Sequence, residues 1–150
     1  MIPYGSQEIR EEDIQAVSET LKADLITQGP KVDEFERALC EQFGCDYAVA
    51  VSSGTMALQL AYQGLGVGSG DEVVTTPNTF LATANGIIYN SGIPRFVDID
   101  PETFNLSLEN LEEYLSETDN QQNLKGIVPV HFSGQPCKME KIHSLAQKYE

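Results

Sequence analysis

The stretch that most limits the possible folds is residues 46–65, in which three patterns follow one another. A short apolar run, Asp-Tyr-Ala-Val-Ala-Val, has the composition of a strand buried on both faces. Small residues at 52–55 predict a turn, and apolar side chains at Met56, Leu60 and Leu65 recur at helical spacing. A strand, a tight turn and a helix in this order bring free backbone N–H groups and the positive end of a helix dipole to one point. The sequence therefore predicts an anion-binding turn at residues 52–55.

Two interpretations of this turn stay open. Gly54 has no side chain where a ligand would approach, and the hydroxyls of Ser52, Ser53 and Thr55 can bond to a phosphate. The same small hydroxyl residues are also preferred at helix N-caps, so an ordinary helix start explains them equally well.

The rest of the chain alternates between helical and extended patterns after two N-terminal helices. Helices are expected at residues 11–23, 32–43, 56–65, 79–89, 108–115 and from 138 onward, and strands at residues 46–51, 72–76, 95–100 and 124–132. Gly44 is expected to end the second helix, Ser107 to cap the fifth, and residues 117–123 to form a polar loop. Strands that alternate with helices form βαβ units. The predicted fold class is therefore α/β, a mostly parallel sheet flanked by helices.

Composition excludes several classes of partner. Nine basic residues stand against 23 acidic ones, giving a net charge of −14, and no basic stripe is present, which argues against nucleic acid and anionic membranes. There is no signal-peptide pattern and no apolar run near the roughly 20 residues of a membrane span, so a cytoplasmic location is expected. Cys40, Cys45 and Cys137 lack metal-binding spacing and are interpreted as reduced thiols, with no metal site.

Ligands in parallel α/β sheets bind at the carboxyl ends of the strands, which here fall at residues 52–55, 77–80, 98–100 and 131–135. Phe80 at this edge has two interpretations: it packs in the core, or it stacks on a flat ligand ring. No Gly-x-Gly-x-x-Gly or Gly-Lys-Ser/Thr motif supports a dinucleotide or Walker-type site.

Other polar residues near this edge carry weaker signals. His131 either donates to a ligand or serves the structure alone, and His143 is expected on the surface. The acidic run from Asp98 to Glu109 imitates a calcium loop, but Thr103 replaces the required glycine, so turn and helix-start acids explain it better.

Five segments in order resemble the beginning of the sugar aminotransferases of the DegT/DnrJ/EryC1/StrS family. They are residues 23–30 (ADLITQGP), 50–57 (AVSSGTMA), 70–80 (GDEVVTTPNTF), 96–100 (FVDID) and 128–136 (VPVHFSGQP). Residues 1–5 and 131–137 are most similar to the branch that aminates C4 of a UDP-linked 4-keto-6-deoxy-amino sugar in pseudaminic acid biosynthesis.

The resemblance implies a fold-type I architecture and pyridoxal 5'-phosphate as the cofactor. It implies that Gly54 and Thr55 hold the cofactor phosphate and that Phe80 stacks on its ring. The residues that it places around the nucleotide sugar are Tyr4, Asp24, Leu25, Ile26, Thr27 and Gly54.

By the same resemblance, the Schiff-base lysine and the acid that pairs with the pyridinium lie beyond residue 150. Residues 1–150 are therefore expected to be the N-terminal part of the cofactor-binding large domain, without the rest of that domain or the small domain, and to be inactive alone. The last helix also reaches residue 150 without a stop signal. The full-length enzyme would be a homodimer that takes a UDP-linked keto sugar and an amino donor such as glutamate. The alternative is a non-catalytic module of the same fold that binds a phosphate ligand or a partner.

Overall fold

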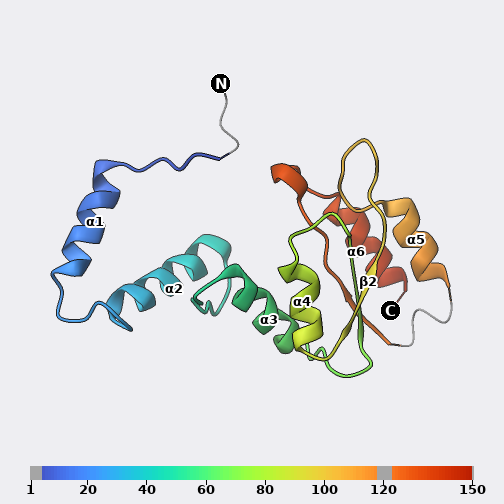
Figure 1. The fold of residues 1–150 in the computed structure, drawn as a ribbon, viewed down its shortest axis with the longest axis horizontal. Helices are drawn as coiled ribbons and strands as arrows, with labels where there is room; N and C mark the ends of the chain where they lie inside the picture. The colour runs from blue at the N-terminus through green and yellow to red at the C-terminus, as the bar shows by residue number, and fades with distance from the viewer. Residues whose placement is uncertain (1–4, 118–122, 150) are drawn as a thin grey trace. The chain divides into compact units, whose positions relative to one another are not determined.

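The computed structural model describes residues 5–117 and 123–149 and divides the chain into two compact units, residues 1–50 and 51–150 (Figure 1). The first unit contains α1 (Glu11–Leu21) and α2 (Pro30–Phe43), which confirms both predicted helices. Gly44 ends α2 in the left-handed conformation with φ of 65°, as its position predicted. Helix α1 ends two residues before the predicted boundary.

The predicted strand at residues 46–51 is wrong for the described structure, in which these residues form no strand. Tyr47 is 88% exposed and Val49 is 72% exposed, so the apolar run is not buried. A strand requires a neighbour that pairs with its backbone groups. Here the Ala50 N–H donates instead to a side chain, the carboxylate of Glu36, at 2.7 Å.

The second unit is a small parallel sheet with helices on both faces. Its helices are α3 (Gly54–Gly64), α4 (Ala82–Tyr89), α5 (Leu108–Ser116) and α6 (Met139–Lys148), with a 3-10 turn η2 (Phe132–Gly134). Its strands are β1 (Glu72–Thr75), β2 (Ile93–Phe96) and β3 (Leu124–Ile127), in the order β2-β1-β3 with both pairings parallel. Within residues 5–117 and 123–149, no helix combines the length and apolar character that crossing a membrane requires.

The central strand β1 divides the core into two layers because successive side chains point to opposite faces. Val73 joins a buried cluster with Tyr62 of α3 and Ile87 of α4. Val74 joins the other cluster, which includes Leu111 of α5 and Ile142 of α6. Figure 1 shows α4 and α5 on opposite sides of the sheet, and α6 contributes to the same cluster as α5. The predicted α/β class is therefore confirmed.

Several element boundaries differ from the prediction. The second strand was expected at residues 95–100 and the third at residues 124–132, but the ladders end at Phe96 and Ile127, opposite the end of β1. Beyond these points the chain turns into loops at the carboxyl edge of the sheet. Helix α4 begins at Ala82 rather than at residue 79, and most of the expected loop at residues 117–123 lies outside the described residues.

A buried carboxylate connects three elements at the opposite end of β1. Glu72 is 8% exposed and forms an ion pair with Arg95 of β2, and it accepts a hydrogen bond from the Tyr114 hydroxyl of α5 at 3.1 Å. The bond from Arg95 lowers the pKa of Glu72, with a smaller contribution from Tyr114. Burial, followed by the bond to Glu72, raises the pKa of Tyr114 to about 12.

We expect Glu72→Gln to lower the free energy of unfolding by about 1–3 kcal/mol at pH 7, because it removes a charged hydrogen-bond acceptor. The pKa of Glu72 is below its ordinary 4.5 in the folded state, so the unfolded chain binds the proton more tightly. The contribution is therefore complete above pH 4.5 and is lost as the pH falls through the lower folded-state value. Urea denaturation at pH 7 and pH 3 should show the difference between wild type and variant shrinking in acid.

Glu112→Gln is the matched control, since Glu112 pairs with Lys148 on the surface. An exposed pair contributes about 0–1 kcal/mol. Equal losses in the two variants would contradict the role given to Glu72.

Candidate functional site

The turn before α3 begins with a capped helix. Ser53 has extended backbone angles, and its Oγ accepts a hydrogen bond from the Met56 N–H at 3.3 Å. The N-cap interpretation is therefore confirmed for Ser53.

Capping leaves the next two backbone donors of the turn available. The N–H groups of Gly54 and Thr55 have no acceptor among the residues that the structure describes. A Cβ built on Gly54 would meet no atom within 4 Å, so open space lies beside the turn. Two free donors at the positive end of an eleven-residue helix fit an anion such as a phosphate. The two interpretations of the turn are thus compatible, since Ser53 caps the helix and its neighbours keep their donors.

The C-terminal half of α3, the helix that follows the turn, packs against α4. The Tyr62 hydroxyl donates to the Thr83 carbonyl at 3.0 Å, and its ring lies where a Cβ on Gly86 would approach to 2.8 Å. Only a glycine of α4 allows this close contact. The buried side of α3 is therefore the side of Tyr62, whereas Met56 and Leu60 are exposed.

Phe80 lies between the end of β1 and the start of α4 and is 78% exposed. The core interpretation of this residue is therefore wrong for the described structure. Its position is fixed by the backbone, because the Thr83 N–H donates to its carbonyl at 3.0 Å. A hydroxyl contact of 2.8 Å between Thr79 and Thr83 also holds this segment. The aromatic ring remains free to stack on a planar ligand.

Loops from the three strands meet at the carboxyl edge of the sheet. The Asn78 side chain, after β1, donates to the carbonyl of Phe104, after β2, at 3.3 Å. The ring of Phe104 lies 6.0 Å from that of Phe132, after β3. The sequence did not single out these contacts, since the partners of Asn78 and Phe104 lie more than 25 residues away.

The acidic segment after β2 forms a turn. Oδ1 of Asp100 accepts the N–H groups of Thr103 and Glu102, both at 2.9 Å. These bonds, with Thr103 contributing most, lower the pKa of Asp100, and the charge of Lys138 adds a smaller effect. The backbone bonds account for the pattern that imitates a calcium loop.

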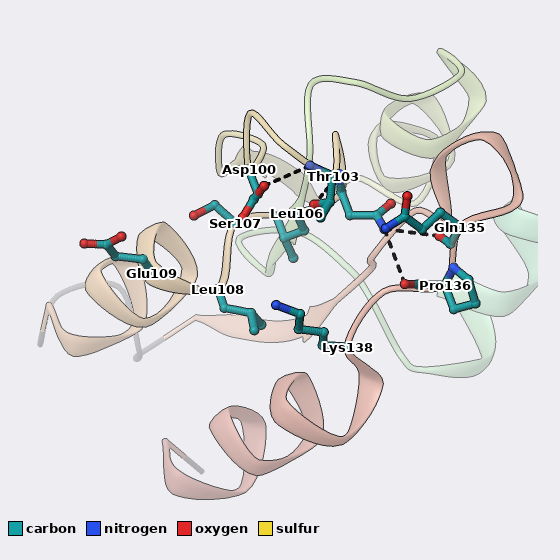
Figure 2. A pocket seen from close by; sticks show the side chains of 10 residues that line it. Asp100, Thr103, Leu106, Ser107, Leu108, Glu109, Gln135, Pro136 and Lys138 are labelled. Carbon is teal, nitrogen blue, oxygen red and sulfur yellow. Dashed lines mark hydrogen bonds between the residues drawn. The ribbon is translucent and has the colours of Figure 1, made fainter.

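A pocket of about 250 Å³ lies beside these loops (Figure 2). It is lined by Asp100, Thr103, Asn105, Leu106, Ser107, Leu108, Glu109, Gln135, Pro136 and Lys138. Figure 2 shows Glu109 at one end and Gln135 and Pro136 at the other. Gly54, Thr55 and Phe80 are not part of its lining, so this pocket is separate from the predicted cofactor contacts.

The remaining predicted residues are spread over the chain. Asp24, Leu25, Ile26 and Thr27 are exposed between α1 and α2 of the first unit, and Tyr4 lies outside the described residues. Both histidines are exposed, and the three cysteines are free thiols.

Solved structures with the same fold define the class of protein. The putative sugar aminotransferase Spr1654 of Streptococcus pneumoniae superposes with a TM-score of 0.85 and 33% identity, over 98% of this chain and 36% of that chain. NtdA of Bacillus subtilis, solved with bound cofactor PMP, gives a TM-score of 0.82 and 33% identity over 94% of this chain and 32% of that chain. The fold is that of the fold-type I aminotransferases, as the resemblance implied.

The family follows from the sequence itself. The model of the DegT/DnrJ/EryC1/StrS aminotransferase family matches residues 7–150, and the chain belongs to this family. It is 43% identical over 148 residues to SpsC of Bacillus subtilis, a spore coat polysaccharide biosynthesis protein. Spr1654 has been solved in both a PLP-form and a PMP-form, which confirms the expected cofactor for the family.

The chain spans about a third of the length of these relatives. The alignment with SpsC includes 99% of this chain but 37% of SpsC, and the superposition includes 36% of Spr1654.

We expect Phe80→Ala in the full-length protein to weaken cofactor binding by about 0.5–1.5 kcal/mol through the lost ring stacking. Because Phe80 is mostly exposed, the free energy of unfolding should change by less than about 0.5 kcal/mol in the cofactor-free protein. Cofactor titration and urea denaturation of the same variant measure the two effects separately.

Two control variants show how an exposed and a buried position respond to the same kind of change. Leu81→Ala changes another exposed apolar residue and should affect neither quantity, while Ile87→Ala, at a fully buried position, should cost about 2–5 kcal/mol of stability. A Phe80 variant that behaves like the Ile87 variant would restore the core interpretation.

Proposed function

We propose that this chain is the N-terminal part of the large domain of a pyridoxal-phosphate-dependent sugar aminotransferase. The observation that carries the proposal is the pair of free N–H groups at Gly54 and Thr55, with open space beside them, in a chain of this family. These donors and the dipole of α3 would hold the cofactor phosphate, and the Thr55 hydroxyl would add a third donor. The exposed ring of Phe80 would lie against the cofactor ring.

Pyridoxal phosphate, when bound, supplies an electron sink and carries the amino group between donor and acceptor. The residues of this chain bind and orient it. The lysine and the acid that this chemistry requires are assigned to the rest of the full-length enzyme, since none of the lysines at positions 22, 31, 125, 138, 141 and 148 lies in a motif for that role. Residues 1–150 alone are expected to be inactive.

The proposed acceptor is a UDP-linked 4-keto-6-deoxy-amino sugar of the pseudaminic acid type, aminated at C4. Similarity of residues 1–5 and 131–137 to that branch supports this choice, and the role of SpsC in polysaccharide biosynthesis is compatible with it. Tyr4, residues 24–27 and Gly54 are proposed to line the sugar nucleotide. The full-length enzyme is proposed to act in the cytoplasm as a homodimer, with glutamate as the amino donor.

Gly54→Val in the full-length protein should reduce the cofactor retained through purification by at least about tenfold, because the side chain would occupy the space beside the free donors. Gly64→Val makes the same change at the other end of α3, where a Cβ also meets no atom within 4 Å. Absorbance of the bound cofactor and circular dichroism measure retention and folding. Equal retention in the two variants would contradict the phosphate assignment.

The substrate assignment is tested with the full-length enzyme, glutamate and two acceptors, a UDP-linked 4-keto-6-deoxy-amino sugar and a dTDP-linked 4-keto-6-deoxy sugar. Mass spectrometry of the products should show amination of the UDP-linked sugar. Amination of the dTDP-linked sugar alone would reject the proposed branch and leave the aminotransferase function in place. Failure with every keto sugar, in a protein that retains cofactor, would favour the non-catalytic module.

A further inference from the structure

One buried amide side chain connects two loops of the carboxyl edge. Asn105, after β2, is 5% exposed. Its Nδ2 donates to the carbonyls of Gln135 at 3.1 Å and Pro136 at 3.4 Å, bonds that appear as dashed lines in Figure 2. Its Oδ1 accepts the Phe132 N–H at 2.9 Å. Asn105 therefore uses both its donor and its acceptor groups on a single loop, residues 131–137.

That loop depends on side chains for its shape. A 3-10 turn of three residues is its only regular structure, and two backbone bonds close it internally, from Gly134 to His131 and from Gln135 to Phe132. The Cys137 N–H donates to Nδ1 of His131 at 3.0 Å. The loop is thus held from inside by its own histidine and from outside by Asn105.

The backbone around Asn105 adopts a conformation that needs such support. Phe104, directly before it, has φ of 58°, and Ser133 in the loop has φ of 51°. Residues with a side chain rarely occupy this region, and they remain there only when surrounding contacts determine it. The Phe104 N–H donates to the Asp100 carbonyl at 2.8 Å, and Asn105 bonds to Phe132 before Ser133 and to Gln135 after it.

The bond from Cys137 also determines the proton position on His131. A nitrogen that accepts a hydrogen bond carries no proton, so the neutral ring holds its proton on Nε2. The residue is exposed at the start of the loop at residues 131–137. It is therefore a hydrogen-bond donor at the edge where ligands of such sheets bind.

We propose that Asn105 is a positioning residue that holds residues 131–137 so that Nε2–H of His131 donates to an oxygen atom of the ligand bound at this edge. The inference rests on the proposed function for the identity of that ligand, whose oxygen belongs to the cofactor or to the keto sugar. The effect of Asn105 on binding passes through His131, and this dependence separates positioning from a general loss of stability.

The test uses the full-length enzyme with Asn105→Ala, His131→Phe and the double variant. Each single change should raise the cofactor Kd or the KM for the keto sugar about tenfold, the expected effect of one lost hydrogen bond. A rise in the cofactor Kd would identify the cofactor as the ligand of His131, and a rise in KM would identify the keto sugar. The double variant should be no weaker than His131→Phe alone, because Asn105 acts through that ring. Hydrogen exchange of residues 131–137 should accelerate in Asn105→Ala.

Asn90→Ala is the matched control. The Asn90 amide also donates to two backbone carbonyls, those of Gln59 and Gly86, but it lies at the far end of α4. This variant should leave exchange of residues 131–137 and both binding constants unchanged, and its effect on stability should simply add to that of His131→Phe.

Three results would overturn the proposal: unchanged exchange in Asn105→Ala, binding constants that stay at the wild-type value in both single variants, or effects that multiply in the double variant. A wild-type enzyme that aminates no keto sugar would contradict the proposed function instead. Exchange and cofactor Kd would then still decide the role of Asn105.

Discussion

Burial of β1 on both faces is the constraint on which the second unit depends. Val73 and Val74 are adjacent in sequence, yet each belongs to a different apolar cluster, so a helical layer is required on either side of the strand. Both neighbouring strands run parallel to β1, and their connections therefore cross over through helices. This topology brings the ends of three strands to one edge, where residues far apart in the chain come within hydrogen-bonding distance.

The two free donors at the start of α3 result from an incomplete cap. Ser53 satisfies one backbone donor of α3 and leaves those of Gly54 and Thr55 available. A complete cap would leave the helix dipole without an exposed donor to offer a phosphate. The packing of Tyr62 on Gly86 is as important, because it fixes the C-terminal half of α3 against α4, the helix whose first turn follows Phe80.

Side-chain amides determine the shape of the carboxyl edge. Asn78 and Asn105 both bond to backbone groups of loops that lie on other strands. Such bonds satisfy backbone groups that neither helix nor sheet can pair. The edge is therefore organised by polar contacts, whereas apolar burial holds the sheet and helices beneath it.

The sequence alone determined the local features of this chain. Helical spacing located the six α-helices of the described residues, though not the 3-10 turn η2. Gly44 and Ser107 marked helix ends that the structure confirms, and the order of patterns predicted the parallel sheet. These features depend on residues within a few positions of one another, so a linear pattern contains them.

Only the tertiary structure decided which apolar residues are covered and which polar groups meet. The run at residues 46–51 has the composition of a strand but finds no neighbouring strand in the described chain, and Phe80 lies exposed beside a core helix. Asn105 gave no signal in the sequence, because its partners lie about thirty residues away. Burial and long-range hydrogen bonds are properties of the assembled layers, and no spacing rule along a single strand or helix contains them.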